Sequence, residues 1–317
     1  MNRREILQTL AGGAMLATRP ARGAQAKPET HTYKTVTGCE IKADVWNASP
    51  GAKRPTVMWI HGGALINGSR KGVGQLFHDR LLEFGYIVIS IDYRLTPETK
   101  LPEIIKDVQD AWRWVHEQGP KRFGVDPQRV AAAGGSAGGY LTLMTGFCVE
   151  PRPRALASFY GYGDLTTPWL AEPDAFYRKQ PLVSPEEAER AVGTAILSEA
   201  PPQNQRGRFY LYTRQQGIWP QQVAGHDPHK ESKWFDPYCP IRNVTAEYPP
   251  AILIHGTADT DVPYEESKNM AARLSAAGVE HEFITMPGVG HGLSGAKPEE
   301  AADANKRAAE FLRAHLS

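Results

Sequence analysis

Residues 130–139 read Val-Ala-Ala-Ala-Gly-Gly-Ser-Ala-Gly-Gly, and this stretch decides the fold. At its centre is the pattern G-x-S-x-G, which is weak evidence by itself because chance produces it in about one chain of this length in ten. Its setting is more specific, since residues 130–133 are a short apolar run typical of a buried strand and residues 137–147 have helical periodicity. Ser136 is therefore predicted to lie on a tight turn from strand to helix, where neighbouring glycines let the two elements pass closely.

A serine at such a turn becomes a nucleophile only when a neighbouring base takes its proton, so a histidine and a carboxylate are needed further along the chain. His291 lies in a glycine-lined loop after the last predicted strand, and Asp259 follows the predicted strand at residues 251–255. Ligand sites of parallel sheets gather at this end of the strands. Asp261, two residues further on, is the alternative acid, and we favour Asp259.

An acyl-transfer site also needs N–H donors where negative charge develops on the substrate oxygen. The sequence His61-Gly62-Gly63-Ala64 directly follows a predicted strand at residues 56–60, and its glycines allow the backbone to approach a substrate. We expect the oxyanion hole to consist of the backbone N–H groups of Gly63 and Ala64, joined by that of Ala137 behind the nucleophile.

Short apolar runs alternate with longer helical patterns on both sides of these motifs, which predicts a mostly parallel sheet flanked by helices. Residues 33–45 are expected to add antiparallel edge strands before the parallel part begins. The remaining strands are predicted at residues 56–60, 87–91, 130–133, 156–160, 251–255 and 281–286. The helices are predicted at residues 74–84, 102–117, 137–147, 264–277 and 298–315.

Residues 161–250 break the alternation, because they are rich in Pro, Gln and aromatic residues and contain no clear strand. We interpret them as a cap insertion, after the strand near 156–160, within a single domain that spans residues 27–317. The aromatic residues of this insertion either wall an acyl or aryl pocket or form the small core that a cap needs to fold. They are Trp169, Phe176, Tyr177, Phe209, Tyr210, Tyr212, Trp219, Trp234, Phe235 and Tyr238.

Residues 1–26 have the three-part layout of an export signal. Arg3 and Arg4 open it, an uncharged run rich in Ala, Gly and Leu covers residues 6–18, and Ala24-Gln25-Ala26 offers a cleavage site. The paired arginines resemble a twin-arginine signal, so we expect an exported, periplasmic protein. The alternative is an amphipathic N-terminal helix on a cytoplasmic protein. The apolar run is too short to span a bilayer, so no stable membrane anchor is expected.

The composition disfavours several other classes of protein. With 41% hydrophobic and 22% charged residues among 317, the chain has the composition of a globular protein rather than of a disordered or fibrous one. Lys and Arg (36) balance Asp and Glu (35), which leaves no basic surplus for nucleic acid. The widely spaced Cys39, Cys148 and Cys239 exclude a disulfide framework and a thiolate zinc site. No metal site is expected at His226 and His229 either, because Pro228 opposes the helix that would align them.

Three motifs together resemble the α/β-hydrolase superfamily, and specifically its hormone-sensitive-lipase-like and bacterial feruloyl/acetyl esterase-like branches. They are His61-Gly62-Gly63, then Asp92-Tyr93-Arg94-Leu95-Thr96-Pro97-Glu98, then Gly134-Gly135-Ser136-Ala137-Gly138-Gly139. The chain order Ser, Asp, His is also that of this superfamily. The resemblance covers residues 50–148 and 248–315.

This resemblance implies a cofactor-free serine hydrolase that acts on small carboxylic esters, with Ser136, Asp259 and His291 as its catalytic residues. Two positions depart from the lipase-like branch: Gly135 stands where Asp usually precedes the nucleophile, and Ala64 stands where a third glycine usually follows. Two other functions remain open. One is a peptidase or amidase of the oligopeptidase type, and the other is a binding protein that keeps a hydrolase scaffold without turnover.

Overall fold

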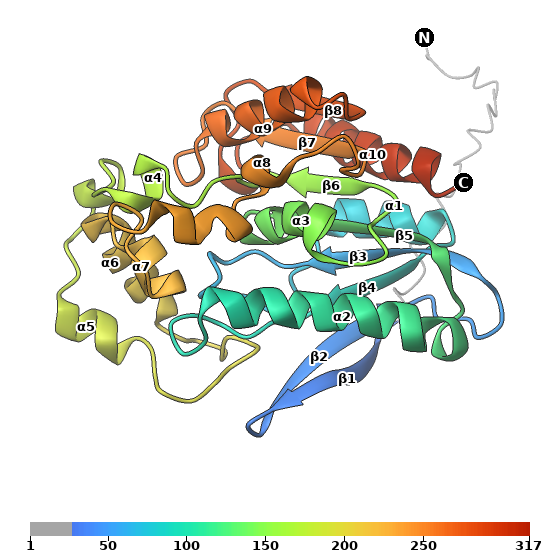
Figure 1. Cartoon of the computed structure of the whole chain (residues 1–317), viewed down its shortest axis with the longest axis horizontal. Coiled ribbons are helices and arrows are strands. Elements are labelled where there is room, and N and C mark those ends of the chain that lie inside the picture. Colours follow the sequence, from blue (N-terminus) through green and yellow to red (C-terminus); the bar gives the residue numbers. More distant parts are fainter. Residues whose placement is uncertain (1–26) are drawn as a thin grey trace, which may run out of the picture.

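The computed structural model describes residues 27–317, and its centre is an eight-stranded sheet in the order β1-β2-β4-β3-β5-β6-β7-β8 (Figure 1). The strands are β1 (Glu29–Val36), β2 (Cys39–Trp46), β3 (Arg54–Ile60), β4 (Ile87–Ile91), β5 (Val125–Gly135), β6 (Leu156–Phe159), β7 (Ala251–Gly256) and β8 (His281–Met286). Strand β2 pairs antiparallel with both β1 and β4, and every pair from β4 to β8 is parallel. The predicted mostly parallel sheet with antiparallel edge strands is confirmed.

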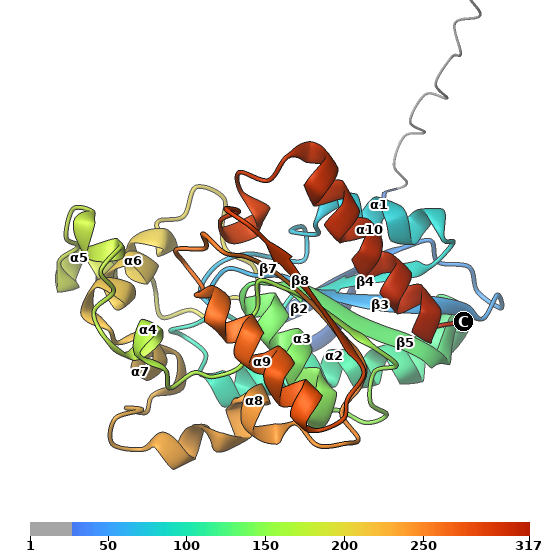
Figure 2. The same ribbon diagram turned by 90° about the horizontal axis from the view of Figure 1, so that it is seen from above.

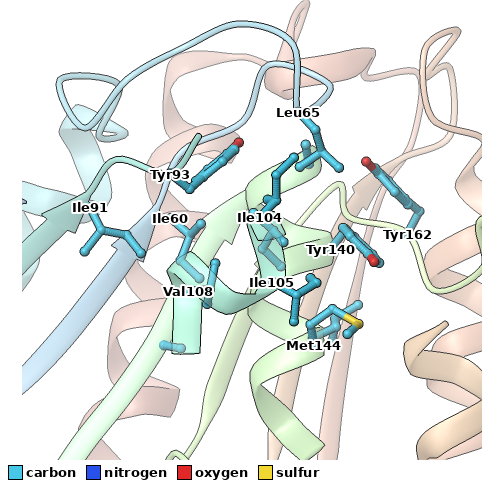
Figure 3. Close-up of a cluster of buried hydrophobic side chains, with 14 of the residues drawn as sticks. Ile60, Leu65, Ile91, Tyr93, Ile104, Ile105, Val108, Tyr140, Met144 and Tyr162 are labelled. Carbon is cyan, nitrogen blue, oxygen red and sulfur yellow. The ribbon is translucent and has the colours of Figure 1, made fainter. Parts of the chain in front are cut away.

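Helices cover both faces of this sheet, because its buried strands carry apolar side chains on both sides. Alternate residues of β3 show the two layers: Val57 and Trp59 pack with α1 and α10, whereas Met58 and Ile60 pack with α2 and α3. Figure 2 shows α1 and α10 together on one face, and Figure 3 shows the core beneath α2 and α3. The helices are α1 (Gln75–Glu83), α2 (Leu101–Arg122), α3 (Ala137–Cys148), α9 (Tyr264–Ala276) and α10 (Pro298–His315).

Helix α2 is longer than the predicted span of residues 102–117, and this is the largest error among the predicted helices. It continues through Gly119 and Pro120 to Arg122. Pro120 lies in the last turn, where the helix is about to end in any case. A Cβ atom on Gly119 would lie 2.8 Å from a methyl carbon of Val125, so glycine lets this end of the helix pack closely on β5.

Between β6 and β7 the structure contains helices and loops but no strand, as the composition predicted. The helices are α4 (Pro168–Ala171), η1 (Tyr177–Lys179), α5 (Pro185–Arg190), α6 (Arg206–Gln216), α7 (Trp219–Ala224), η2 (Ser232–Tyr238) and α8 (Pro240–Asn243). Helices α4 to α7 gather beyond the carboxyl ends of the parallel strands, at the left of Figure 1. Most aromatic residues of this segment, including the buried Phe209, Trp219 and Phe235, pack into the hydrophobic cluster that also contains residues of α2 and α3.

A buried ion pair fastens this segment to the rest of the protein. Arg206, at the start of α6, donates to both carboxylate oxygens of Glu98, at 2.8 and 2.7 Å. The same guanidinium donates to the backbone oxygens of Ile66 and Thr96. The side chains of Glu98 and Arg206 are 0% and 3% exposed. Each charge is therefore stabilised by its partner in place of water.

We predict that Glu98→Gln lowers the free energy of unfolding by about 3 kcal/mol at pH 7, because it leaves the Arg206 charge buried without its partner. Burial alone would raise the pKa of Glu98, but the bonds from Arg206 and the Gly193 N–H hold it below its usual 4.5. The stabilisation is therefore present above about pH 4.5 and is lost as the pH falls through the lower pKa of the folded state.

Urea unfolding at pH 7 measures this effect. The matched control is Glu83→Gln, which breaks the exposed ion pair of Glu83 with Arg80 and is expected to cost less than about 0.5 kcal/mol. Equal losses in the two variants would show that the buried pair does not anchor the segment.

The remaining sequence predictions have mixed outcomes. The predicted export signal at residues 1–26 lies outside the described residues. Within residues 27–317, none of the helices combines the length and apolar character needed to cross a bilayer. Cys39, Cys148 and Cys239 are all free thiols. All three charged residues of the Asp92-to-Glu98 motif make buried contacts: Asp92 binds Arg70, Arg94 binds Asp107 and Glu98 binds Arg206.

Candidate active site

Ser136 lies on the turn between β5 and α3, in a backbone conformation that residues other than glycine rarely adopt. Its φ and ψ are 57° and −124°, so the turn holds the residue under strain. A Cβ atom on Gly134 would lie 2.4 Å from the Gly138 oxygen, and one on Gly138 would lie 2.0 Å from the Ile60 oxygen. Both positions therefore require glycine, which lets β3, β5 and α3 meet directly beneath the serine hydroxyl.

The structure brings His291 and Asp259 to this serine from distant parts of the chain. The Nε2 atom of His291 lies 3.0 Å from the Ser136 Oγ, and its Nδ1 lies 2.8 Å from the Asp259 Oδ2. His291 begins the short helix η3 (His291–Leu293), which follows β8. With the proton on Nδ1, the imidazole donates to Asp259 and presents Nε2 as an acceptor to the serine hydroxyl, which is the arrangement of a general base.

Asp259 is held in its charged form by four donors. Its Oδ1 accepts the backbone N–H groups of Asp261 and Val262, both at 2.9 Å, and its Oδ2 is bound by His291 and by His255 Nε2 at 3.2 Å. Burial would raise the pKa of this carboxyl, but the hydrogen bonds from the two histidines lower it well below its usual range. His255, the last residue but one of β7, is a supporting residue that the sequence analysis did not single out.

Asp261, the alternative acid, lies on the other side of the imidazole. Its Oδ2 is 3.3 Å from His291 Nε2, the atom that faces the serine, whereas the hydrogen bond at Nδ1 is made with Asp259. Its Oδ1 accepts the hydroxyls of Tyr177, at 2.7 Å, and Tyr210, and Arg214 Nη1 at 3.0 Å. The orienting contact at Nδ1 is thus made by Asp259, and Asp261 instead joins the site to the segment between β6 and β7.

The loop after β3 brings Gly63 and Ala64 beside Ser136. Gly63 has φ +114°, and a Cβ atom there would lie 2.2 Å from the Asn67 oxygen, so the loop requires glycine at this position. Among the described residues, the N–H groups of Gly63 and Ala64 donate to no backbone carbonyl, which leaves them available to a substrate. Ala137 opens α3 directly after Ser136.

His61 packs beneath this loop and has a structural role. It is buried, its ring stacks on Tyr93 at 4.2 Å, and its Nδ1 lies 2.7 Å from the Gly62 oxygen. Burial lowers the pKa of His61 to about 4, so the ring stays neutral around pH 7. It therefore adds no positive charge to the site.

These groups open onto one cavity of about 560 Å³. Asp261 is its one carboxylate, and no Lys or Arg stands among its lining residues within the described chain. Tyr210 is the one aromatic residue of the inserted segment in that lining, so the remaining aromatic residues favour the core interpretation. The lining consists of Trp59, Gly62, Gly63, Ala64, Asn67, Gly72, Val73, Gly74, Gly135, Ser136, Tyr160, Tyr210, Asp261, His291 and Gly292.

Tyr160 is a second site residue that the sequence analysis missed. It directly follows β6, has a positive φ of 41°, and its ring packs edge-on against His291 with the centroids 4.9 Å apart. A Cβ atom on Gly135 would lie 2.9 Å from the Tyr160 hydroxyl. The absence of a side chain at Gly135 therefore gives this tyrosine its place beside the imidazole.

The parallel sheet and the strained serine turn define the α/β-hydrolase fold. Comparison with family models agrees: the BD-FAE model matches residues 44–274, and the dienelactone hydrolase family model matches residues 235–316. The first match covers well over half of the chain, so the chain belongs to the BD-FAE family within the α/β-hydrolase superfamily.

Individual relatives include esterases. The esterase LipC of Mycobacterium tuberculosis is 30% identical over 82% of this chain and 60% of its own length. The non-reducing polyketide synthase ausA of Aspergillus calidoustus is 27% identical over 99% of this chain, which spans only 15% of that protein. Among solved structures, esterase 2 of Thermogutta terrifontis has a TM-score of 0.61 at 23% identity, covering 90% of this chain and 91% of its own. The chain is therefore a member of a hydrolase family that includes esterases.

Proposed function

We propose that this protein is a serine hydrolase that cleaves carboxylic esters through an acyl-enzyme on Ser136. The observation that carries the proposal is the hydrogen-bonded path from Ser136 through His291 to Asp259, with bonds of 3.0 and 2.8 Å, beside two unused backbone N–H groups. Family membership and the esterase relatives support the ester class.

In the first step, the neutral His291 takes the Ser136 proton on Nε2 while Oγ attacks the ester carbonyl. The carbonyl oxygen becomes negatively charged, and the N–H groups of Gly63, Ala64 and Ala137 are proposed to stabilise it. Asp259 holds the imidazole in the productive tautomer and stabilises the imidazolium that forms.

The tetrahedral intermediate then collapses, and His291 gives its Nε2 proton to the departing alcohol. In the second half of the reaction a water molecule loses a proton to His291 and attacks the acyl-serine, which releases the acid and restores the serine hydroxyl. The segment between β6 and β7 serves as the cap in this proposal, because it supplies Tyr210 to the cavity wall and holds Asp261 through Arg214.

The proposal is tested by turnover of p-nitrophenyl acetate and butyrate, measured beside aminoacyl p-nitroanilides. We expect hydrolysis of the esters with a kcat/KM at least about 100-fold above that of the anilides. Faster cleavage of the anilides would make the protein a peptidase or amidase. Tight binding of an ester in calorimetry, without hydrolysis of any ester offered, would identify a binding protein instead.

The pH dependence of hydrolysis follows from the state of His291. Burial would lower its pKa, but the hydrogen bond to Asp259 and the negative charge of Asp261 raise it above the usual 6.5. The base must be neutral, so kcat/KM should rise with pH and reach half its plateau above pH 6.5. At pH 5.5 it should be at least about tenfold below the plateau.

This profile is measured with an ester that has no titratable group, at constant ionic strength. A profile that is flat between pH 5.5 and 8.5, or a midpoint below pH 6, would contradict the assignment of His291 as the base.

A further inference from the structure

The two oxygens of Asp261 have different surroundings, since Oδ1 is held by three donors whereas Oδ2 faces His291. Oδ1 accepts three donors from the cap, namely Tyr177, Tyr210 and Arg214. They fix the carboxylate so that Oδ2 lies 3.3 Å from His291 Nε2. The side chain is 21% exposed and lines the cavity, so a substrate in the cavity can approach this carboxylate.

The local charge is negative even though Arg214 is present. The Arg214 side chain is 1% exposed and is shared by two carboxylates, with Nη1 at 3.0 Å from Asp261 and Nη2 at 2.7 Å from Asp174. Burial raises the pKa of Tyr177 and Tyr210, so both hydroxyls stay protonated and donate. This cluster therefore carries one net negative charge, and among residues 27–317 no Lys or Arg lines the cavity to balance it.

The distance to His291 shows which part of a substrate meets this charge. Nε2 must hand its proton to the alcohol oxygen, so that oxygen lies within about 3 Å of Nε2 when the alcohol departs. Oδ2 lies 3.3 Å from the same nitrogen. The alcohol oxygen and Oδ2 are therefore at most about 6 Å apart, a gap that can be bridged by an ammonium group separated from the alcohol oxygen by two carbons.

Two aromatic rings line the same cavity as Asp261. Tyr210 donates to Asp261 and lines the cavity, and Tyr160 lines it on the side of His291. A carboxylate combined with aromatic faces is a combination that attracts organic cations, because the π face of a ring is also negative.

We infer that Asp261 makes this hydrolase selective for esters whose alcohol portion carries an ammonium group close to the ester oxygen. The inference rests on the proposed esterase function and names the substrate class for the same site. Asp261 acts here as a specificity-determining residue and makes or breaks no bond in the reaction at Ser136.

Three acetate esters of similar shape test the inference. They are the cation 2-(trimethylammonio)ethyl acetate, its neutral isostere 3,3-dimethylbutyl acetate, and the anion 3-acetoxypropanoate. Each kcat/KM is divided by the rate constant for hydroxide-catalysed hydrolysis of the same ester, which removes differences in intrinsic reactivity. We expect the corrected ratio of cation to neutral ester to be about ten for the wild type, with the anion slower than both.

In Asp261→Asn this ratio is expected to fall about tenfold, to near one, because the amide keeps the shape of the carboxylate but not its charge. The matched control is Glu117→Gln, which removes the same charge from an exposed position on α2 outside the cavity and should keep the wild-type ratio. A ratio of rates on one enzyme sample is insensitive to the fraction of folded protein.

A wild-type ratio near one overturns the inference without any variant, and so does a ratio that is unchanged in Asp261→Asn. Either result leaves the esterase proposal intact, because the neutral ester is still hydrolysed. Failure to hydrolyse any of the three esters or p-nitrophenyl acetate overturns the proposed function itself.

Discussion

Replacing Ser136 with alanine is expected to lower kcat for p-nitrophenyl acetate by about five to six orders of magnitude, the loss typical when a serine hydrolase loses its nucleophile. The remaining N–H groups and the binding cavity keep some acceleration over water. A fluorophosphonate probe reports the same chemistry directly, because it reacts covalently with an activated serine. It should label the wild type and leave Ser136→Ala unlabelled.

The matched control for this variant is Ser158→Ala. Ser158 is buried in the neighbouring strand β6 and donates to the Gly139 oxygen at 3.2 Å, so its loss removes a buried hydroxyl near the turn but no reacting group. The Ser158→Ala variant should lose about 1 kcal/mol of stability and should keep both ester turnover and labelling by the probe. Equal labelling of wild type and Ser136→Ala would remove Ser136 as the nucleophile.

The substitution Asp259→Asn is also expected to have a large effect, a loss of about 10⁴-fold in kcat. The amide cannot take the place of a carboxylate that accepts from His255, His291 and two backbone N–H groups at once. Its NH₂ group would favour the imidazole tautomer with the proton on Nε2, which cannot accept the serine proton. Steady-state kinetics at the pH plateau measure this loss.

Asp261→Asn serves as the control of identical chemistry, two residues away on the opposite side of the ring. Its loss in kcat on a neutral ester should be at least about 100-fold smaller than that of Asp259→Asn, because Asp261 does not touch Nδ1. Similar losses of kcat in the two variants would contradict the assignment of Asp259 as the residue that orients the imidazole.

The fold was predictable because its decisive signals are local. Strand β4 is a contiguous run of buried apolar residues and matches its predicted span. The edge strand β8 also matches its span, and the glycine-flanked turn at Ser136 is recognisable from a few residues. Helix α2 was predicted too short because Gly119 and Pro120 read as a helix stop. In the structure they close its last turn against β5.

The site was predictable only where chemistry required particular residue types in a fixed chain order. Ser136, Asp259 and His291 form that kind of set, and their roles stay predictions until variants are measured. The surroundings of Asp261 left no such signal. Tyr177 and Arg214 lie 84 and 47 residues away from it in the sequence, and no local pattern encodes a contact between a cap helix and a loop after β7.

The loop after β7 contacts both helix α6 and the carboxylate of Asp259. Asp261 binds Arg214 of α6 through its carboxylate, and its own N–H donates to Asp259 at 2.9 Å. Transplanting a foreign cap onto this scaffold would therefore disturb the acid beneath the imidazole as well as the substrate space. Chimaeras that retain Arg214 and Tyr210 should stay active more often than those that replace the whole segment. These two residues should therefore be kept when the segment is redesigned.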